Sequence, residues 1–142
     1  MIYSATMNGE NLNVLVNTRL DEPTGLAIDY FMDNRIYWCD EKLNLIETIK
    51  PDGTDRRQIR HNLMNNPYKI DIFESHIYWL LRSAGTVGRI DKFGRGAVLN
   101  YVQGLDNAED LKVFHKHKYP TQGLYIFHKT CIFLTVVSYF SF

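Results

Sequence analysis

The chain has 142 residues, of which 45% are hydrophobic and 23% are charged, the proportions of an ordinary globular protein. Sixteen basic residues balance sixteen acidic residues, so net charge gives no general attraction to nucleic acid or to an anionic membrane. Two cysteines are too few for a disulfide scaffold and lack the spacing of a zinc site, and neither the phosphate-loop nor the dinucleotide glycine pattern occurs.

The first predicted element is a β-hairpin over residues 2–6 and 13–17. Asn8-Gly9 lies between the two strands and is the strongest short-range hairpin signal, because both residues tolerate positive φ. The first six residues have neither the charged region nor the apolar region of a secretory signal, so we expect none here.

The hairpin pattern returns twice along the chain. Residues 46–53, followed by 57–60, repeat it 44 residues later. Residues 87–94, followed by 97–99, form a third copy after a further 41 residues. Regular recurrence at this distance is typical of an array of small structural units.

A second repeated element precedes each later hairpin. The alternating run 22–30 corresponds to 66–74, again offset by 44 residues, and a shorter copy without proline occupies 109–115. An aromatic strand follows the first two copies, at Arg35–Asp40 and at His76–Leu81, and their Ile-Tyr-Trp cores lie 41 residues apart.

One full period therefore contains four predicted strands. Four short strands in about 40 residues are the pattern of a β-propeller blade, and helical periodicity is nowhere sustained. We predict an all-β fold, a partial propeller with four-stranded antiparallel blades. The strands expected in the first complete period are Leu26–Asp29, Arg35–Asp40, Leu45–Lys50 and Arg57–His61.

The count of strands gives about three blades, whereas closed propellers have about four to eight. An open arc leaves strand edges and apolar faces uncovered, so we do not expect a well-behaved monomer. The predicted divisions are the outer half of a blade (1–20), two complete blades (21–63 and 64–105), the first strand of the next blade with the exit (106–120), and a tail (121–142).

The tail does not continue the repeat. It ends in 13 uncharged residues from Thr130 to Phe142, short of the ~20 that a membrane-spanning helix needs. Its β-branched and aromatic content is typical of a strand and is prone to aggregation. We interpret the tail as an extension unrelated to the repeat fold, with weak membrane anchoring as the alternative.

The strand Ile36–Asp40 resembles the Tyr-Trp-Thr-Asp motif of the class B repeats of low-density lipoprotein receptors. The resemblance covers roughly residues 1 to 120 and is nearest to large endocytic receptors of the megalin type. Residues 110–120 resemble the exit of that family's propeller, which leads toward a cysteine-rich module. Other matching positions are Pro23, Gly25–Asp29, Ile46-Glu47 and Asp52–Thr54, where the family has Pro, Gly-Leu-Ala-Val-Asp, Ile-Glu and Asp-Gly-Ser.

The resemblance implies half of a six-bladed extracellular propeller, flanked in a parent receptor by cysteine-rich modules. The parent would capture protein ligands at the cell surface and release them in acidic endosomes. Protein ligands and the neighbouring modules are then the expected partners. No cofactor is expected, and calcium would enter only through those modules. The location of the chain itself stays open.

The chain departs from the family pattern at several positions. Cys39 stands where the motif has Thr, and Leu80-Leu81 stands where the second copy would have Thr-Asp. In the family, the motif Asp makes a structural bridge to the neighbouring blade; Asp40 can do so, whereas the second copy has no such side chain. After Pro120 the chain has only Cys131 instead of several closely spaced cysteines. A truncated transcript, an alternative exon or a gene fragment would explain these features together.

The aromatic pairs suggest either ligand stacking or packing between blades, and we favour packing because large aromatics contribute most of the buried area. The predicted structural residues are Tyr37, Trp38, Asp40, Tyr78, Trp79 and Asp29. Cys39 is expected to be a buried, unpaired thiol.

An enzyme propeller would gather acidic residues around its central channel as metal ligands or general acids. In the repeat alignment, however, Asp29 pairs with Phe73 and Asp71 pairs with Ala27, so the acids do not recur at one level. We therefore predict no catalytic and no metal-binding residue, with a fragment of a hydrolase-type propeller as one alternative and a truncated, non-functional product as the other.

His115 and His117 lie at the propeller exit, where a neighbouring module would dock in a parent receptor. The ordinary pKa of histidine is about 6.5, so such residues change charge between the cell surface and an endosome. We name both as candidate pH sensors, with solvated loop histidines as the default interpretation.

Overall fold

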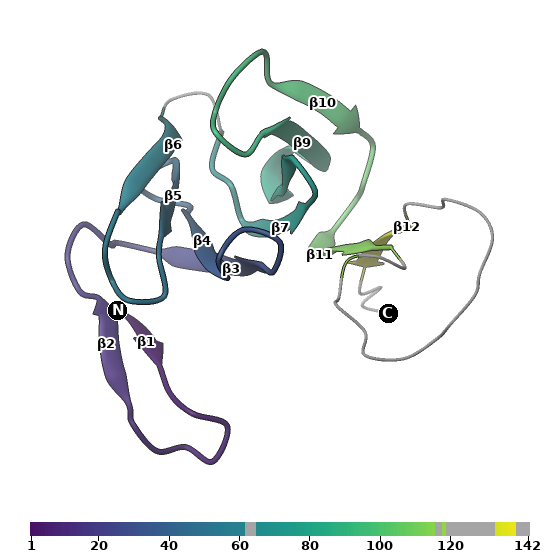
Figure 1. The fold of residues 1–142 in the computed structure, drawn as a ribbon. Coiled ribbons are helices and arrows are strands. Elements are labelled where there is room, and N and C mark those ends of the chain that lie inside the picture. The colour runs from purple at the N-terminus through teal and green to yellow at the C-terminus, as the bar shows by residue number, and fades with distance from the viewer. Residues whose placement is uncertain (62–64, 116–117, 119–132, 139–142) are drawn as a thin grey trace, which may run out of the picture.

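The computed structural model describes residues 1–61, 65–115, 118 and 133–138, with the backbone alone described at 60–61 and 133–138. In these ranges the chain forms twelve strands and one turn of 3-10 helix (Figure 1). No helix among the described residues has the length and apolarity that a membrane crossing requires. The elements are β1 (Ile2–Ser4), β2 (Asn13–Val16), β3 (Pro23–Asp29), β4 (Arg35–Asp40), β5 (Leu45–Ile49), β6 (Arg57–His61), β7 (Lys69–Phe73), β8 (His76–Leu81), η1 (Arg82–Ala84), β9 (Thr86–Asp91), β10 (Leu99–Val102), β11 (Ala108–Phe114) and β12 (Phe133–Ser138).

Two four-stranded antiparallel sheets form the centre of the structure. The first blade has the order β3-β4-β5-β6 and the second blade has the order β7-β8-β9-β10. The predicted all-β fold with four-stranded blades is thus confirmed. β5 ends at Ile49, one residue before the predicted end, because the amide of Lys50 donates to the carbonyl of Thr54 in the following turn (3.0 Å).

A two-stranded sheet lies at each end of the arc. β1 and β2 form the N-terminal half-blade, and β11 and β12 form the C-terminal half-blade. β12 belongs to the predicted tail, and its backbone pairs antiparallel with β11, so that Phe114 faces Phe133 and Ala108 faces Ser138. The strand character predicted for the tail is present there, whereas its pairing with β11 was not predicted.

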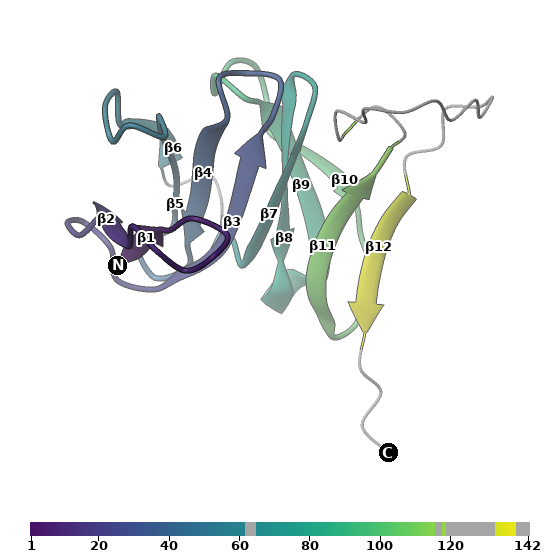
Figure 2. The ribbon, with the colours of Figure 1, turned by 60° about the horizontal axis from the view of Figure 1, so that its bottom comes forward.

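The sheets follow one another around an arc, with the N-terminal and C-terminal half-blades at opposite ends (Figures 1 and 2). The first strands of successive units, β3, β7 and β11, contact one another in that order. They are therefore the innermost strands, and the sheets extend outward from them. The arc does not close, in agreement with the predicted partial propeller.

Most side chains on both faces of β4 and of β8 are buried, since side chains alternate between the two faces of a strand and each of these strands has apolar neighbours on either side. On β4, Trp38 packs with Ile2 and Val16 of the N-terminal half-blade. Its neighbours Tyr37 and Cys39 pack instead against the second blade. The same alternation places Trp79 toward the first blade and Tyr78 toward β11. The apolar core therefore consists of layers between the sheets.

Turn chemistry recurs with the repeat. Gly9 and Gly53 occupy equivalent turns with φ near +82°, where a side chain would be strained. In each turn the glycine amide donates to the carbonyl three residues earlier, at Thr6 (2.9 Å) and Lys50 (3.0 Å). The predicted Asn-Gly hairpin is one instance of this turn.

Candidate functional site

The four motif aromatics lie inside the joints between the sheets. Trp38 and Trp79 are fully buried, and Tyr37 and Tyr78 are nearly so. Burial raises the pKa of Tyr37 and of Tyr78 above the usual tyrosine value, since a phenolate would lose its water. These rings are therefore part of the core, with at most 2% of each residue exposed.

Asp40 is a buried carboxylate that binds backbone amides. It accepts hydrogen bonds from Asp21 N (2.8 Å) and Glu22 N (3.1 Å), which lie in the segment joining the N-terminal half-blade to the first blade. It also accepts one from Leu43 N (2.9 Å) in its own turn. The side chain thus fixes the connecting segment against the end of β4.

The second motif copy forms its joint without a carboxylate. Leu81 stands in place of Asp40 and packs into the apolar layer between the two complete blades. The connecting segment before β7 is held from the first blade instead. The backbone N–H of Asn66 donates to the side-chain oxygen of Asn44 (2.8 Å). The side-chain amide of Asn66 donates to the backbone carbonyl of Glu41 (3.2 Å).

The two inner-strand acids each form a buried ion pair with a lysine. Asp29 accepts from Lys92 Nζ (2.6 Å), which comes from the β9–β10 turn of the second blade. Asp71 pairs with Lys118 and also accepts from the amide of Val113 on β11 (2.7 Å). Each carboxylate therefore links one inner strand to the following unit of the arc.

The register agrees with the predicted offset between these acids. Asp29 faces Arg35 and Phe73 faces His76 at the same level, whereas Asp71 faces Tyr78 at the level of Ala27. Burial lowers the pKa of Lys118 from its usual range, although the hydrogen bond and charge of Asp71 act in the opposite direction. The acids thus face different cations at different levels, and they form no shared site.

Sequence reasoning missed the cations of these joints. Lys92 stands at the repeat position of Pro51, so no repeat pattern marks it. A further buried acid, Glu47, pairs with Arg56, whose guanidinium also donates to the carbonyl of Thr18 (2.9 Å). Glu47 lies in the repeated Ile-Glu pair, and this pair was the only signal for it. Within the described residues, no group of three His, Cys, Asp or Glu side chains could hold a metal ion.

The structure describes only one of the two candidate pH sensors, His115 and His117. His115 is buried, and its ring lies 4.5 Å from the ring of Phe73, measured between centroids. Lys118 N donates to the carbonyl of His115 (3.0 Å), so the backbones of these two residues are hydrogen-bonded to each other. His117 lies outside the described residues.

Cys39 is buried on β4, and its thiol is free of any disulfide. Burial raises the pKa of Cys39 to about 12, with the Thr24 hydroxyl (3.9 Å) acting in the opposite direction. The thiol is therefore protonated at neutral pH, and its role here is packing.

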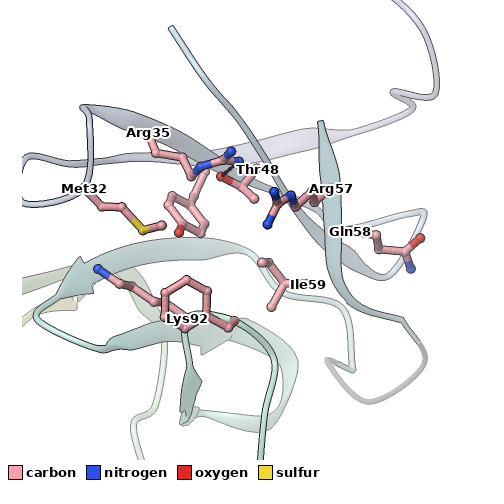
Figure 3. Close-up of a pocket in the computed structure, with 9 residues that line it drawn as sticks. Met32, Arg35, Thr48, Arg57, Gln58, Ile59 and Lys92 are labelled. Carbon is pink, nitrogen blue, oxygen red and sulfur yellow. Dashed lines mark hydrogen bonds between the residues drawn. The ribbon is translucent and has the colours of Figure 1, made fainter. Parts of the chain in front are cut away.

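A pocket of about 100 Å³ opens between the first blade and the β9–β10 turn (Figure 3). Its walls come from β4, β5, β6 and two turns, and Figure 3 shows Arg57 directed toward Arg35 and Thr48, with Gln58 directed away. The lining residues are Met32, Arg35, Tyr37, Thr48, Arg57, Gln58, Ile59, Lys92 and Phe93.

The pocket combines positive charge with apolar surface. Asp55 holds both arginines: it pairs with Arg35, and Arg57 Nε donates to its second oxygen (2.6 Å). The hydrogen bond from Arg57 holds the pKa of Asp55 below its usual range. Three cations thus share two carboxylates, Asp55 and the Asp29 that binds Lys92. The arrangement favours a ligand that has an acidic group next to an apolar group.

Among the proteins that resemble the chain in sequence are three receptors. The vitellogenin receptor of Solenopsis invicta is 35% identical over 92 residues, 65% of this chain, and the vitellogenin receptor Yl of Drosophila melanogaster is 37% identical over 93 residues, or 66%. The sortilin-related receptor of Homo sapiens is 33% identical over 117 residues, or 82%. The chain spans 5% of the length of each receptor. No protein-family model matches the chain.

Solved structures resemble it in fold. A chain of the nidogen/laminin complex superposes with a TM-score of 0.62 and 27% identity, covering 74% of this chain and 41% of that chain. Virginiamycin B lyase from Staphylococcus aureus superposes with a TM-score of 0.50 and 18% identity, covering 65% and 31%. The likeness to the lyase extends to the propeller fold alone.

Proposed function

We propose a function that starts from family membership: the chain carries class B repeats of the low-density lipoprotein receptor family, folded as a partial β-propeller. It serves as a non-catalytic ligand-binding and scaffold module of an endocytic receptor. In the parent receptor it supports uptake of protein ligands at the extracellular face of the plasma membrane and their release in acidic endosomes. Neighbouring cysteine-rich modules are its other partners.

One observation carries the proposal: the residues that define the repeat make their contacts within the joints between sheets. The aromatic pairs are buried, and Asp40 binds the backbone of the connecting segment. The acids Asp29 and Asp71, which a hydrolase would need in its channel, are each bound to a lysine. The repeats therefore act as a scaffold, and ligands are bound by exposed groups outside the motif.

The pocket beside Phe93 is the surface that we assign to the ligand. Arg57 is exposed there, and the surplus of positive charge favours an acidic segment of a protein ligand. Two of the similar receptors are named for vitellogenin, so vitellogenin is the first ligand to test.

The test is binding of purified vitellogenin to the immobilised chain at about pH 7, compared among charge-reversed variants. Arg57→Glu should weaken binding by about tenfold or more, because one close charge pair across an interface contributes at least ~1.4 kcal/mol. Lys42→Glu is the matched control. Its side chain is as exposed as that of Arg57 (63%) and is likewise paired with an aspartate, but it lies in the turn at the other end of β4.

The same measurement at about pH 5.5 tests acid-dependent release. Ligand should dissociate faster at the lower pH, and His115→Phe should remove this difference, because the substitution keeps the ring contact with Phe73 and removes the imidazole. Lack of vitellogenin binding by the wild-type chain, or equal losses for Arg57→Glu and Lys42→Glu, would refute the assignment of the pocket.

A further inference from the structure

The two half-blades are complementary parts of one blade. In the N-terminal half-blade, Ile2 packs on Trp38 as Ile46 of β5 packs with Trp79, so β1 and β2 occupy the outer positions. In the C-terminal half-blade, Leu111 and Val113 pack toward the second blade, so β11 is an innermost strand, with β12 beside it. One end of the arc thus has only outer strands and the other end has only inner strands.

Within the described part of the chain, the face at the N-terminal end lacks a neighbour. Leu26 on β3 and Ile70 on β7 are equivalent, since they face Trp38 and Trp79 in their blades. Ile70 is 2% exposed because the first blade covers it, whereas Leu26 is 47% exposed. A pocket between β1 and β3, lined by Ile2, Leu26 and Trp38, occupies the place where the inner strands of a complete blade would lie.

Among the residues that the structure describes, the face at the C-terminal end also lacks a neighbour. Phe73 and Phe114 each end an innermost strand and face the first residue of the next strand in the sheet. Phe73 is 5% exposed because it packs against β11, whereas Phe114 is 62% exposed. Each end of the arc therefore exposes a surface that is buried at the interface inside the molecule.

The two ends fit each other in a second copy of the chain. Phe73 packs with Val113 and His115, and the repeat offset places Ile28 and Tyr30 at the equivalent positions of the first blade. Phe114 of one copy would therefore lie against Ile28 and Tyr30 of the other. In the described part of the chain, neither β1 nor β12 has a strand on its second edge, and pairing them would restore the order seen in the first blade.

We propose that two copies of this chain associate head to tail around a two-fold axis and close a six-bladed ring. The twelve strands in the described residues of one copy amount to three blades, and six blades lie within the range of closed propellers. Each copy contributes its outer half-blade to the inner half-blade of the other, so the ring has two identical interfaces. Closure removes the free edges and covers both exposed apolar faces.

The test is the molar mass of the full chain in solution, measured by light scattering from about 1 to 100 µM protein, since association depends on concentration. The expected species is a dimer with twice the 16.6 kDa mass of the chain. A monomer over the whole range, or a ladder of larger assemblies, would overturn the closed dimer.

Variants identify the surfaces. Leu26→Asp and Phe114→Asp should each raise the dimer dissociation constant tenfold or more, whereas Leu99→Asp should leave it unchanged. Leu99 is the matched control because it is 48% exposed, like Leu26, but lies on the outer strand β10. Circular dichroism and cooperative unfolding confirm that each variant is folded.

Mixing the two variants distinguishes a head-to-tail contact from a face-to-face contact. A mixed dimer has both substitutions in one interface and leaves the other interface intact, with Leu26 of one variant and Phe114 of the other, so association should recover in part on mixing, through the intact interface. A dimer that survives either substitution, or a mixture that stays monomeric, would contradict the proposal.

Discussion

The interface between the two complete blades and the open ends of the arc are built from the same repeat positions, yet only the interface is buried. Ile70 is covered by the first blade, whereas its equivalent Leu26 faces outward. Phe73 packs on β11, whereas its equivalent Phe114 has no cover among the described residues. The comparison shows that exposure in a repeat fold depends on the presence of a neighbour more than on the residue itself.

The largest expected effect breaks the internal interface. Ile70→Ala should lower the free energy of unfolding by about 2–5 kcal/mol, because it leaves a cavity between two packed sheets. The loss should be the same at every protein concentration, as measured by urea denaturation. Leu26→Ala is the comparison and should lower only the part of the stability that depends on protein concentration. Equal losses in the two variants at low concentration would show that Leu26 is buried within one chain.

A smaller effect concerns the polar joint at the N-terminal end. Asp40→Ala should lower the free energy of unfolding by about 2–3 kcal/mol, because the amides of Asp21, Glu22 and Leu43 lose their acceptor. Glu10→Ala, at an exposed turn, is the control and should change little. Thermal unfolding followed by circular dichroism measures both variants. A loss no larger than that of the control would mean that water replaces the carboxylate.

The smallest effect lies in the outer turns and depends on pH. Hydrogen bonds from Thr54, Arg57 and Arg95 hold the pKa values of Asp52, Asp55 and Asp91 below their usual range. Because each pKa is lower in the folded state, the stabilisation by these groups is present above the ordinary value of about 3.9 and is lost as pH falls through the folded-state pKa.

Stability against urea should therefore be insensitive to these groups between about pH 7 and 5 and should decline below about pH 4. Asp55→Asn should reduce the decline, and it should also lower stability at neutral pH because buried Arg35 loses its charged partner. A rise in stability below about pH 4 would contradict the direction of these pKa shifts.

Much of the fold could be predicted because the repeat is local. The alternation of apolar residues in Arg35–Asp40 and its copy, with turn residues between strands, determined which segments become strands and how they follow one another. The offset between Asp29 and Asp71 could also be read from the alignment, and the strand register agrees with it. The pairing of β12 with β11 could not be read in this way, since the tail shares no repeat with the strand beside it.

The candidate site was less accessible to sequence reasoning. Lys92 binds Asp29 across 63 residues, and Lys118 binds Asp71 across 47 residues. Neither lysine recurs in the repeat, so the spacing of residues in the sequence does not predict these ion pairs. The pocket beside Phe93 also depends on contacts between segments that are distant in the sequence, because its walls come from two different blades.

The sequence by itself determined the unit of this protein, a four-stranded blade. In each Tyr-Trp pair the two side chains point to opposite faces of the blade, because side chains alternate along a strand. Only the tertiary structure decided which of these faces are covered, which cations neutralise the buried acids, and which half-blade stands at each end of the arc. The physical reason is that strand formation depends on neighbours in the chain, whereas burial and ion pairing depend on neighbours in space.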